Sequence, residues 1–154
     1  AAFAGGATAL ARQGIDVGAH LIYGLPGDTL ESFLSAAPFL SGLGLRGVTL
    51  HHFHVVSGAP LEAAWRRGEI RVPAYDEYVA ACAAFLERLS PEVAVMRLAG
   101  EAPGSLLLAP RWGKGPKEAS RDVAAERYRE QAESDAERRH EDRRKPLARA
   151  TQHE

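Results

Sequence analysis

The chain has 154 residues, of which 45% are hydrophobic and 25% are charged, and its formal net charge is -1. This length predicts about one domain with a real core, and the near-neutral charge gives no general case for binding nucleic acid or an anionic membrane. The single cysteine, Cys82, excludes a disulfide framework and any multi-cysteine metal or iron–sulfur site within this chain. The first residue is alanine, so we expect a piece of a longer polypeptide. No signal peptide or membrane span is recognised, which favours a cytoplasmic location.

Apolar residues recur at helix or strand spacing over the first 112 residues, and the two kinds of segment alternate. Strands separated by helices predict an α/β fold with a parallel sheet and right-handed crossovers. Three such strands are too few for a closed barrel, so we expect exposed sheet edges. In chain order, we expect the end of a helix at 5–13, a strand at 15–23, a helix at 29–42 kinked at Pro38, a strand at 46–56, a short helix at 60–67, a helix at 75–89 and a strand at 93–98.

The segment that follows the first strand has the residues of a ligand-binding loop. Gly24 and Gly27 allow positive φ and close backbone approach, and Pro26 stiffens the turn. Asp28 or Thr29 can cap the helix that follows. Such a loop presents ligands at the C-terminal end of a parallel strand, although an ordinary strand-to-helix connection uses the same residue types.

The second strand is unusual because it carries three histidines, His51, His52 and His54. Strand alternation places His52 and His54 on one face and His51 on the other. Two imidazoles two residues apart can clamp one metal ion, with His20 and Glu101 as candidates for further ligands. The same pair can instead donate hydrogen bonds to a ligand, or be partly buried and paired with backbone or carboxylate groups.

Arg97 ends the third strand, where it can bind a carboxylate or phosphate or pair with a structural acid at the rim of the sheet. Residues 106–112 are apolar enough to pack back onto the sheet and close the core. Cys82 lies on the apolar side of the helix at 75–89, which predicts a buried, inert thiol.

Charge is concentrated in residues 113–154, which carry 11 Lys+Arg and 10 Asp+Glu, against 8 and 10 in residues 1–112. We place a boundary between the two parts and expect a charged tail that is helical, disordered or both, since this composition does not bury a core. Its basic clusters can touch RNA or an acidic partner, but interleaved acids favour a solvated helix face. The clusters are Arg138-Arg139-His140 and Arg143-Arg144-Lys145.

Together, these motifs resemble those of the radical S-adenosylmethionine (SAM) enzymes, in particular a poorly characterised bacterial family close to the Elp3-like group. The resemblance covers about residues 5–115. The motifs that carry it are His20-Leu21-Ile22-Tyr23-Gly24-Leu25-Pro26-Gly27-Asp28-Thr29, His51-His52-Phe53-His54-Val55-Val56-Ser57-Gly58-Ala59-Pro60-Leu61, Arg97-Leu98-Ala99-Gly100-Glu101-Ala102-Pro103 and Leu108-Ala109-Pro110-Arg111-Trp112.

The resemblance implies the last third of a partial (β/α)6 barrel plus a C-terminal extension. The family's cluster-binding loop of three cysteines does not occur in this chain, so the chain alone is expected to hold no [4Fe–4S] cluster and to be inactive. A missing N-terminal half-barrel of the same polypeptide is the implied partner. By position in the barrel, Gly24, Leu25, Pro26 and Gly27 would lie near the adenosyl group of SAM. His51, His52, His54 and Arg97 would face SAM or substrate, and we assign His52 and His54 to the cofactor and His51 and Arg97 to the substrate.

Two other functions remain open from the residues alone. One is a metal-dependent hydrolase of the (β/α) barrel type with His52 and His54 as ligands, which needs further ligands on strands outside this chain. The other is a non-catalytic module whose charged tail binds a protein or RNA. No catalytic step is assigned to any residue, and the substrate is not identified.

Overall fold

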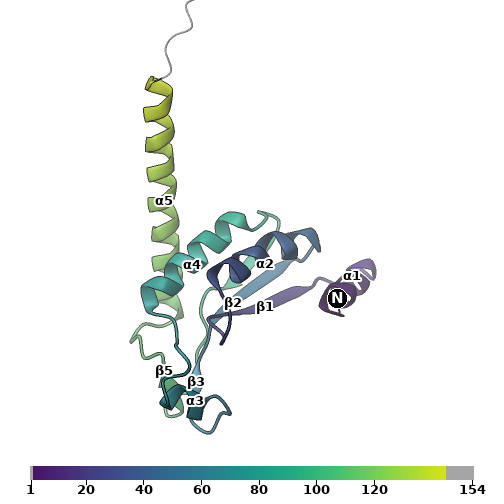
Figure 1. Ribbon diagram of the computed structural model, residues 1–154. Coiled ribbons are helices and arrows are strands. Elements are labelled where there is room, and N and C mark those ends of the chain that lie inside the picture. Colours follow the sequence, from purple (N-terminus) through teal and green to yellow (C-terminus); the bar gives the residue numbers. More distant parts are fainter. Residues whose placement is uncertain (1, 145–154) are drawn as a thin grey trace, which may run out of the picture.

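The computed structural model describes residues 2–144, and at its centre is a parallel three-stranded sheet. The strands are β1 (Gly18–Tyr23), β2 (Gly47–His52) and β4 (Ala94–Arg97), in the order β1-β2-β4. The helices α2 (Leu30–Gly42) and α4 (Tyr75–Arg88) pack against each other and cover the same face of this sheet (Figure 1). The expected α/β architecture with parallel strands is confirmed.

The first helix and the helix after the loop both form close to their expected residue ranges. α1 (Ala2–Arg12) ends just before Gly14, which adopts a φ of 73°. The N-terminus of α2 is capped by Thr29, because Thr29 Oγ1 accepts a hydrogen bond of 3.1 Å from the Ser32 amide. Of the two residues that could cap this helix, Asp28 and Thr29, it is therefore Thr29 that does so. Pro38 lies inside α2, which continues to Gly42.

The single strand expected at 46–56 is wrong, because the chain leaves the main sheet after His52. The last residue pair of β1 and β2 joins Tyr23 to His52, and the Phe53 amide still donates to the Tyr23 carbonyl at 2.9 Å. Beyond that point β1 ends and offers no backbone partners. The chain then turns to form β3 (Val55–Val56) in a second sheet.

Residues 106–112 pack back onto the main core only through Trp112, whose ring lies beside His52 and Tyr78, so the expectation that the whole segment closes the core is wrong in part. β5 (Leu107–Ala109) lies within this segment and pairs antiparallel with β3. A small apolar cluster of Phe53, Val55 and Ala109 forms there, close to α3 (Glu62–Arg66). The two-stranded sheet and α3 lie at one end of the molecule, below the main sheet in Figure 1.

The main core lies between the parallel sheet and its two helices. Large fully buried side chains from β2 and α4 fill it, among them Leu50, Tyr78 and Phe85. Cys82 is also fully buried, as expected. At roughly 25 cal/mol for each Å² of apolar surface removed from water, this layer stabilises the sheet and helices as one unit.

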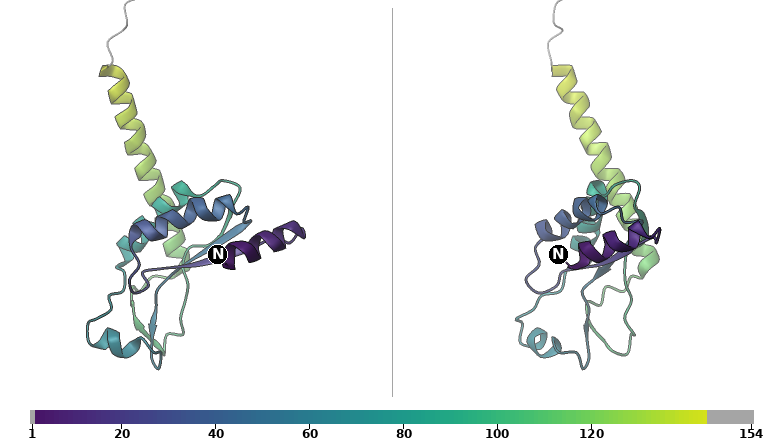
Figure 2. Two further views of the ribbon diagram at one scale, coloured as in Figure 1. Left: turned by 45° about the vertical axis from the view of Figure 1, so that its right-hand side comes forward. Right: turned by 90° about the vertical axis from the view of Figure 1, so that its right-hand side faces the viewer.

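The charged tail is helical through the described part, as α5 (Pro116–Arg144). Its first turns pack on α4, and the helix then extends far beyond the body of the molecule (Figures 1 and 2). Ala119 and Val123 are 2% and 0% exposed and belong to the main core, so the expectation that this segment buries nothing is wrong at its start. Lys145, in the last basic cluster, lies outside the described residues. Within residues 2–144, no helix is long and apolar enough to cross a membrane.

Candidate functional site

The loop after β1 is held in place by a glycine that packs directly on a proline. Gly24 has a φ of 85°, and a Cβ at this position would lie 2.8 Å from Pro73 Cδ. Gly27 has a φ of 88°, with open space where its Cβ would be. Only glycine adopts such φ values without strain. The residues that the sequence singled out as a loop therefore make a tight turn against the segment that leads into α4.

A cavity of about 670 Å³ borders this loop, on the side where Glu77 of α4 lies. Glu77 forms an ion pair of 2.7 Å with Arg71, and the Tyr23 hydroxyl donates to Glu77 at 3.3 Å. The hydrogen bond from Arg71 is the main reason why the pKa of the Glu77 carboxyl is lowered. This volume is within the range of ligand pockets in proteins. Glu77 and Arg71 were not recognised from the sequence, where nothing distinguishes them from other surface charges.

His52 is a buried histidine with an unpaired nitrogen. The residue is 6% exposed, and its ring lies 4.0 Å from the ring of Trp112 and 5.3 Å from that of Tyr78. Its Nδ1 atom has no hydrogen-bond partner among the described residues. Burial, followed by the neighbouring His54 and His51, lowers the pKa of His52 to about 3. The imidazole is therefore neutral near pH 7.

His54 lies beside His52, as predicted, but it lies outside β2, which ends at His52, so strand alternation does not explain this contact. The two ring centroids are 4.0 Å apart. Burial is the largest cause of the lowered pKa of His54. Both rings line a second cavity of about 470 Å³, together with Trp112 and Arg111. This cavity shares no lining residue with the cavity beside Gly24–Gly27, although both adjoin the carboxyl ends of neighbouring strands.

His51 and Arg97 belong to the opposite face of the main sheet, away from His52. His51 Nε2 lies 3.2 Å from Nδ1 of His20 on β1, and the two rings are stacked. Arg97 is on the exposed strand β4, in register with Thr49 of β2. The six residues assigned to the cofactor and the two assigned to the substrate thus border three places: the loop cavity, the His52 cavity and the open sheet face.

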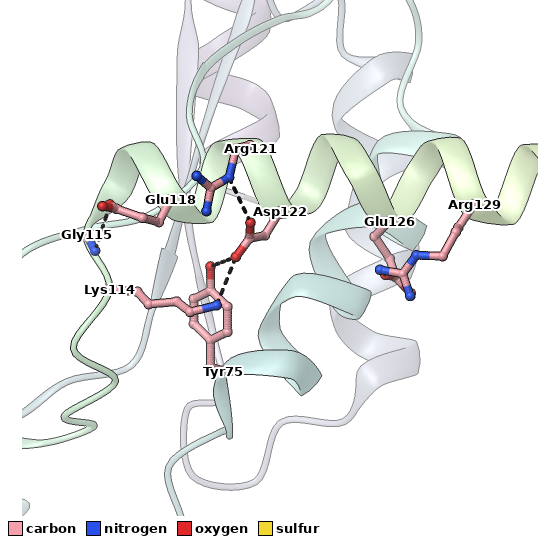
Figure 3. A network of polar contacts seen from close by, with 8 residues as sticks. All are labelled: Tyr75, Lys114, Gly115, Glu118, Arg121, Asp122, Glu126 and Arg129. Carbon is pink, nitrogen blue, oxygen red and sulfur yellow. Dashed lines mark hydrogen bonds and ion pairs between the residues drawn. The ribbon is translucent and has the colours of Figure 1, made fainter.

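Trp112 is a site residue whose neighbours the sequence did not indicate. Its indole covers His52 and donates a hydrogen bond of 3.3 Å to the Pro73 carbonyl. The segment just after it is tied to α5 through Asp122, which accepts hydrogen bonds from Tyr75 at 2.8 Å and Lys114 at 3.0 Å (Figure 3). These donors, with Tyr75 first, lower the pKa of Asp122 to about 2. The start of α5 therefore fixes the wall of the His52 cavity.

Neither a metal centre nor an iron–sulfur cluster is built by the described residues. In residues 2–144 there is no group of three or more His, Cys, Asp or Glu side chains that could hold a metal ion. Cys82 does not fit the role of a cluster ligand, because it is fully buried on α4 and burial raises the pKa of its thiol to about 12. A cluster therefore needs thiolates from outside this chain.

Comparisons with known proteins identify the family and the fold of this chain. Residues 45–129, more than half of the chain, match the family model of the Radical_SAM C-terminal domain. The chain is 30% identical over 107 residues to the uncharacterized protein YtqA of Bacillus subtilis (strain 168), covering 70% of this chain and 33% of YtqA. It is 35% identical over 105 residues to the uncharacterized protein MJ0486 of Methanocaldococcus jannaschii, covering 68% and 33% of the two chains. With protein YhcC of Escherichia coli (strain K12) the identity is 34% over 106 residues, covering 68% and 34%.

The fold is shared with a solved structure of the archaeal Methanocaldococcus infernus Elp3 with an N-terminal deletion, at a TM-score of 0.64 and 18% identity, over 75% of this chain and 28% of that one. This likeness and the parallel order β1-β2-β4 identify the fold as the C-terminal portion of a partial (β/α)6 TIM-like barrel, as expected from the sequence. The chain spans about a third of the length of the curated relatives it matches. On the match over residues 45–129, the chain belongs to the family of the Radical_SAM C-terminal domain.

Proposed function

We propose that this chain is the C-terminal part of a radical SAM enzyme that binds SAM and a [4Fe–4S] cluster as a longer polypeptide. When bound, these cofactors supply reductive cleavage of SAM to a 5'-deoxyadenosyl radical, which abstracts hydrogen from a substrate of unknown identity. Family membership supports the proposal, as does the fact that the curated relatives are about three times longer than the matched segment. The cluster would be held by cysteines outside this chain, since Cys82 is buried on α4.

The observation that carries the proposal is the open face of the main sheet. α2 and α4 cover one face, whereas His20, Ile22 and Met96 are exposed on the other. Within the described residues, β1 pairs on one side only, with β2. An exposed sheet face and a free edge are features that proteins normally cover. We propose that an N-terminal half-barrel of the same polypeptide covers both and encloses the reaction.

The residues of this chain would bind and orient the cofactor rather than perform a chemical step. The loop Gly24–Gly27 borders a cavity large enough for part of SAM, and Gly27, whose Cβ position is open, lets the backbone approach a ligand closely. We assign His52 and His54 to the cofactor as neutral side chains and His51 and Arg97 to the substrate. A single buried thiol fits a reducing compartment, so we place the enzyme in the cytoplasm.

The test uses the full-length protein with its cluster reconstituted under anaerobic conditions. With dithionite and SAM, we expect 5'-deoxyadenosine to form, measured by chromatography, while the 154-residue chain alone forms none. Gly27→Ala should weaken SAM binding, because the added methyl strains the loop at the ligand. Gly14→Ala is the matched control, since Gly14 also has positive φ and open space around its Cβ position but lies away from the loop. A cluster-loaded protein that never cleaves SAM would contradict the proposal.

A further inference from the structure

The open face of the main sheet carries three basic side chains close to one another. His20 comes from β1, His51 from β2 and Arg97 from β4, so each strand of the sheet contributes one. Alternation puts His20 and His51 on the face opposite α2 and α4. Arg97 is in register with Thr49, which precedes His51 by two residues and shares its face, and the register of β2 and β4 shifts just before this pair, so that Met96 is skipped. Arg97 is also near enough to His51 to lower the pKa of that imidazole. Three strands that are distant in sequence therefore bring these groups together.

His51 is held in place from two sides. On one side, its Nε2 atom lies 3.2 Å from His20 Nδ1, which is hydrogen-bond distance. On the other side, its Nδ1 atom lies against the backbone of Gly100, where an added Cβ would approach within 2.3 Å. Gly100 is buried whereas His20 is exposed, so Gly100 is the neighbour that leaves the His51 ring little room to move. The imidazole is thus oriented before any ligand arrives.

The neighbours that act on His51 are cationic or neutral. Burial, then His20, then Arg97 lower its pKa. Among the described residues, no Asp or Glu forms an ion pair with Arg97. A guanidinium without a carboxylate partner attracts an anion and can bind two of its oxygens at once. The sequence left open whether Arg97 pairs with a structural acid, and the described residues provide none.

We propose that His20, His51 and Arg97 form an anion-binding cluster on the open sheet face that holds a carboxylate or phosphate group of the substrate. Arg97 supplies the charged fork, and the hydrogen-bonded histidine pair supplies a further N–H donor. Gly100 is a positioning residue that keeps His51 in place. That the bound anion belongs to the substrate rests on the proposed function, whereas the binding of an anion by these three residues does not.

The first experiment titrates the full-length protein with inorganic phosphate by isothermal calorimetry. We expect saturable binding that Arg97→Gln weakens about tenfold or more, as loss of a charge-assisted contact requires. Arg46→Gln is the matched control, because Arg46 is an exposed arginine at the other end of the same sheet, just before β2. If the protein does not bind phosphate, or if Arg97→Gln and Arg46→Gln change the affinity for phosphate equally, the proposed anion-binding cluster is overturned.

A second variant avoids dependence on the charge of Arg97. Gly100→Ala should displace the His51 ring and weaken phosphate binding, and this loss should disappear in a His51→Ala background. If Gly100→Ala acts equally in both backgrounds, Gly100 does not position His51. Circular dichroism of each variant separates loss of the site from loss of the fold.

The source of the anion is decided by repeating the titration with saturating SAM. If SAM leaves the affinity for phosphate unchanged, the anion is a group of the substrate. If SAM competes with phosphate, the anion-binding cluster holds the carboxylate of SAM, and the assignment to the substrate is overturned. Formation of 5'-deoxyadenosine without substrate is measured on the same wild-type preparation. If the protein cleaves SAM but does not bind phosphate, only the anion-binding site is refuted. If it binds phosphate but holds no [4Fe–4S] cluster or does not cleave SAM, only the proposed function is refuted.

Discussion

Replacing His52 with phenylalanine should remove a large part of the acid sensitivity of this protein. His52 has a folded-state pKa of about 3, against 6.5 in the unfolded chain. The unfolded state therefore binds more protons between these pH values, so stability is fully present above pH 6.5 and is lost as pH falls towards 3. From the two pKa values, this one group makes the folded state about 2 kcal/mol less stable at pH 5 than at pH 7.

Urea unfolding at pH 7 and pH 5 measures this difference. In the His52→Phe protein, the loss of unfolding free energy between the two pH values should be about 2 kcal/mol smaller than in the wild type. The ring fits the same place between Trp112 and Tyr78, so the fold is retained. Phe53→Leu is the control, because it perturbs a buried neighbour without a titrating group and should lower stability equally at both pH values. A wild-type pH dependence in the His52→Phe protein would refute the argument from burial.

Three further predictions concern packing. Gly24→Ala should lower the free energy of unfolding by roughly 2–5 kcal/mol, because the alanine has a positive φ and its Cβ overlaps Pro73. In a double-mutant cycle measured by urea unfolding, Pro73→Ala should recover part of that loss, and additive effects of the two substitutions would refute the overlap. Val123→Ala should lower the free energy of unfolding by roughly 1–3 kcal/mol, because the buried Val123 side chain attaches α5 to the core. Tyr128→Ala, on the exposed part of α5, should change thermal stability little, and equal effects of the two variants would contradict the role of Val123. Cys82 should react with a thiol reagent only after denaturation, followed by absorbance, and rapid labelling of the native protein would contradict its burial.

Local features of the fold follow from local chemistry. The spacing of apolar residues predicted α2, α4 and the three strands of the main sheet, though not the end of β2, because each element must present one apolar face to the core. The loop was predictable because glycine, proline and a hydroxyl cap each restrict the backbone within a few residues. The burial of Cys82 followed from its place on the apolar side of a helix. His52 and His54 lie together as predicted, although the chain leaves β2 between them, so strand alternation is not the reason.

The candidate site is less predictable because its contacts join residues far apart in the chain. His51 meets His20 across 31 positions, and Trp112 donates to Pro73 across 39. No periodicity reports such contacts, since they depend on which strands become neighbours and where each strand ends. For the same reason, the sequence did not separate the loop cavity from the cavity at His52.

The sequence by itself determined the alternation of strands and helices, the glycine loop after the first strand and the family resemblance, all of which depend on short-range patterns. Only the tertiary structure decided that β2 ends at His52 and that residues 107–109 pair with β3, because a strand continues only where a neighbour supplies hydrogen bonds. It also decided that a highly charged helix buries Val123, since burial depends on what α5 meets rather than on its average composition.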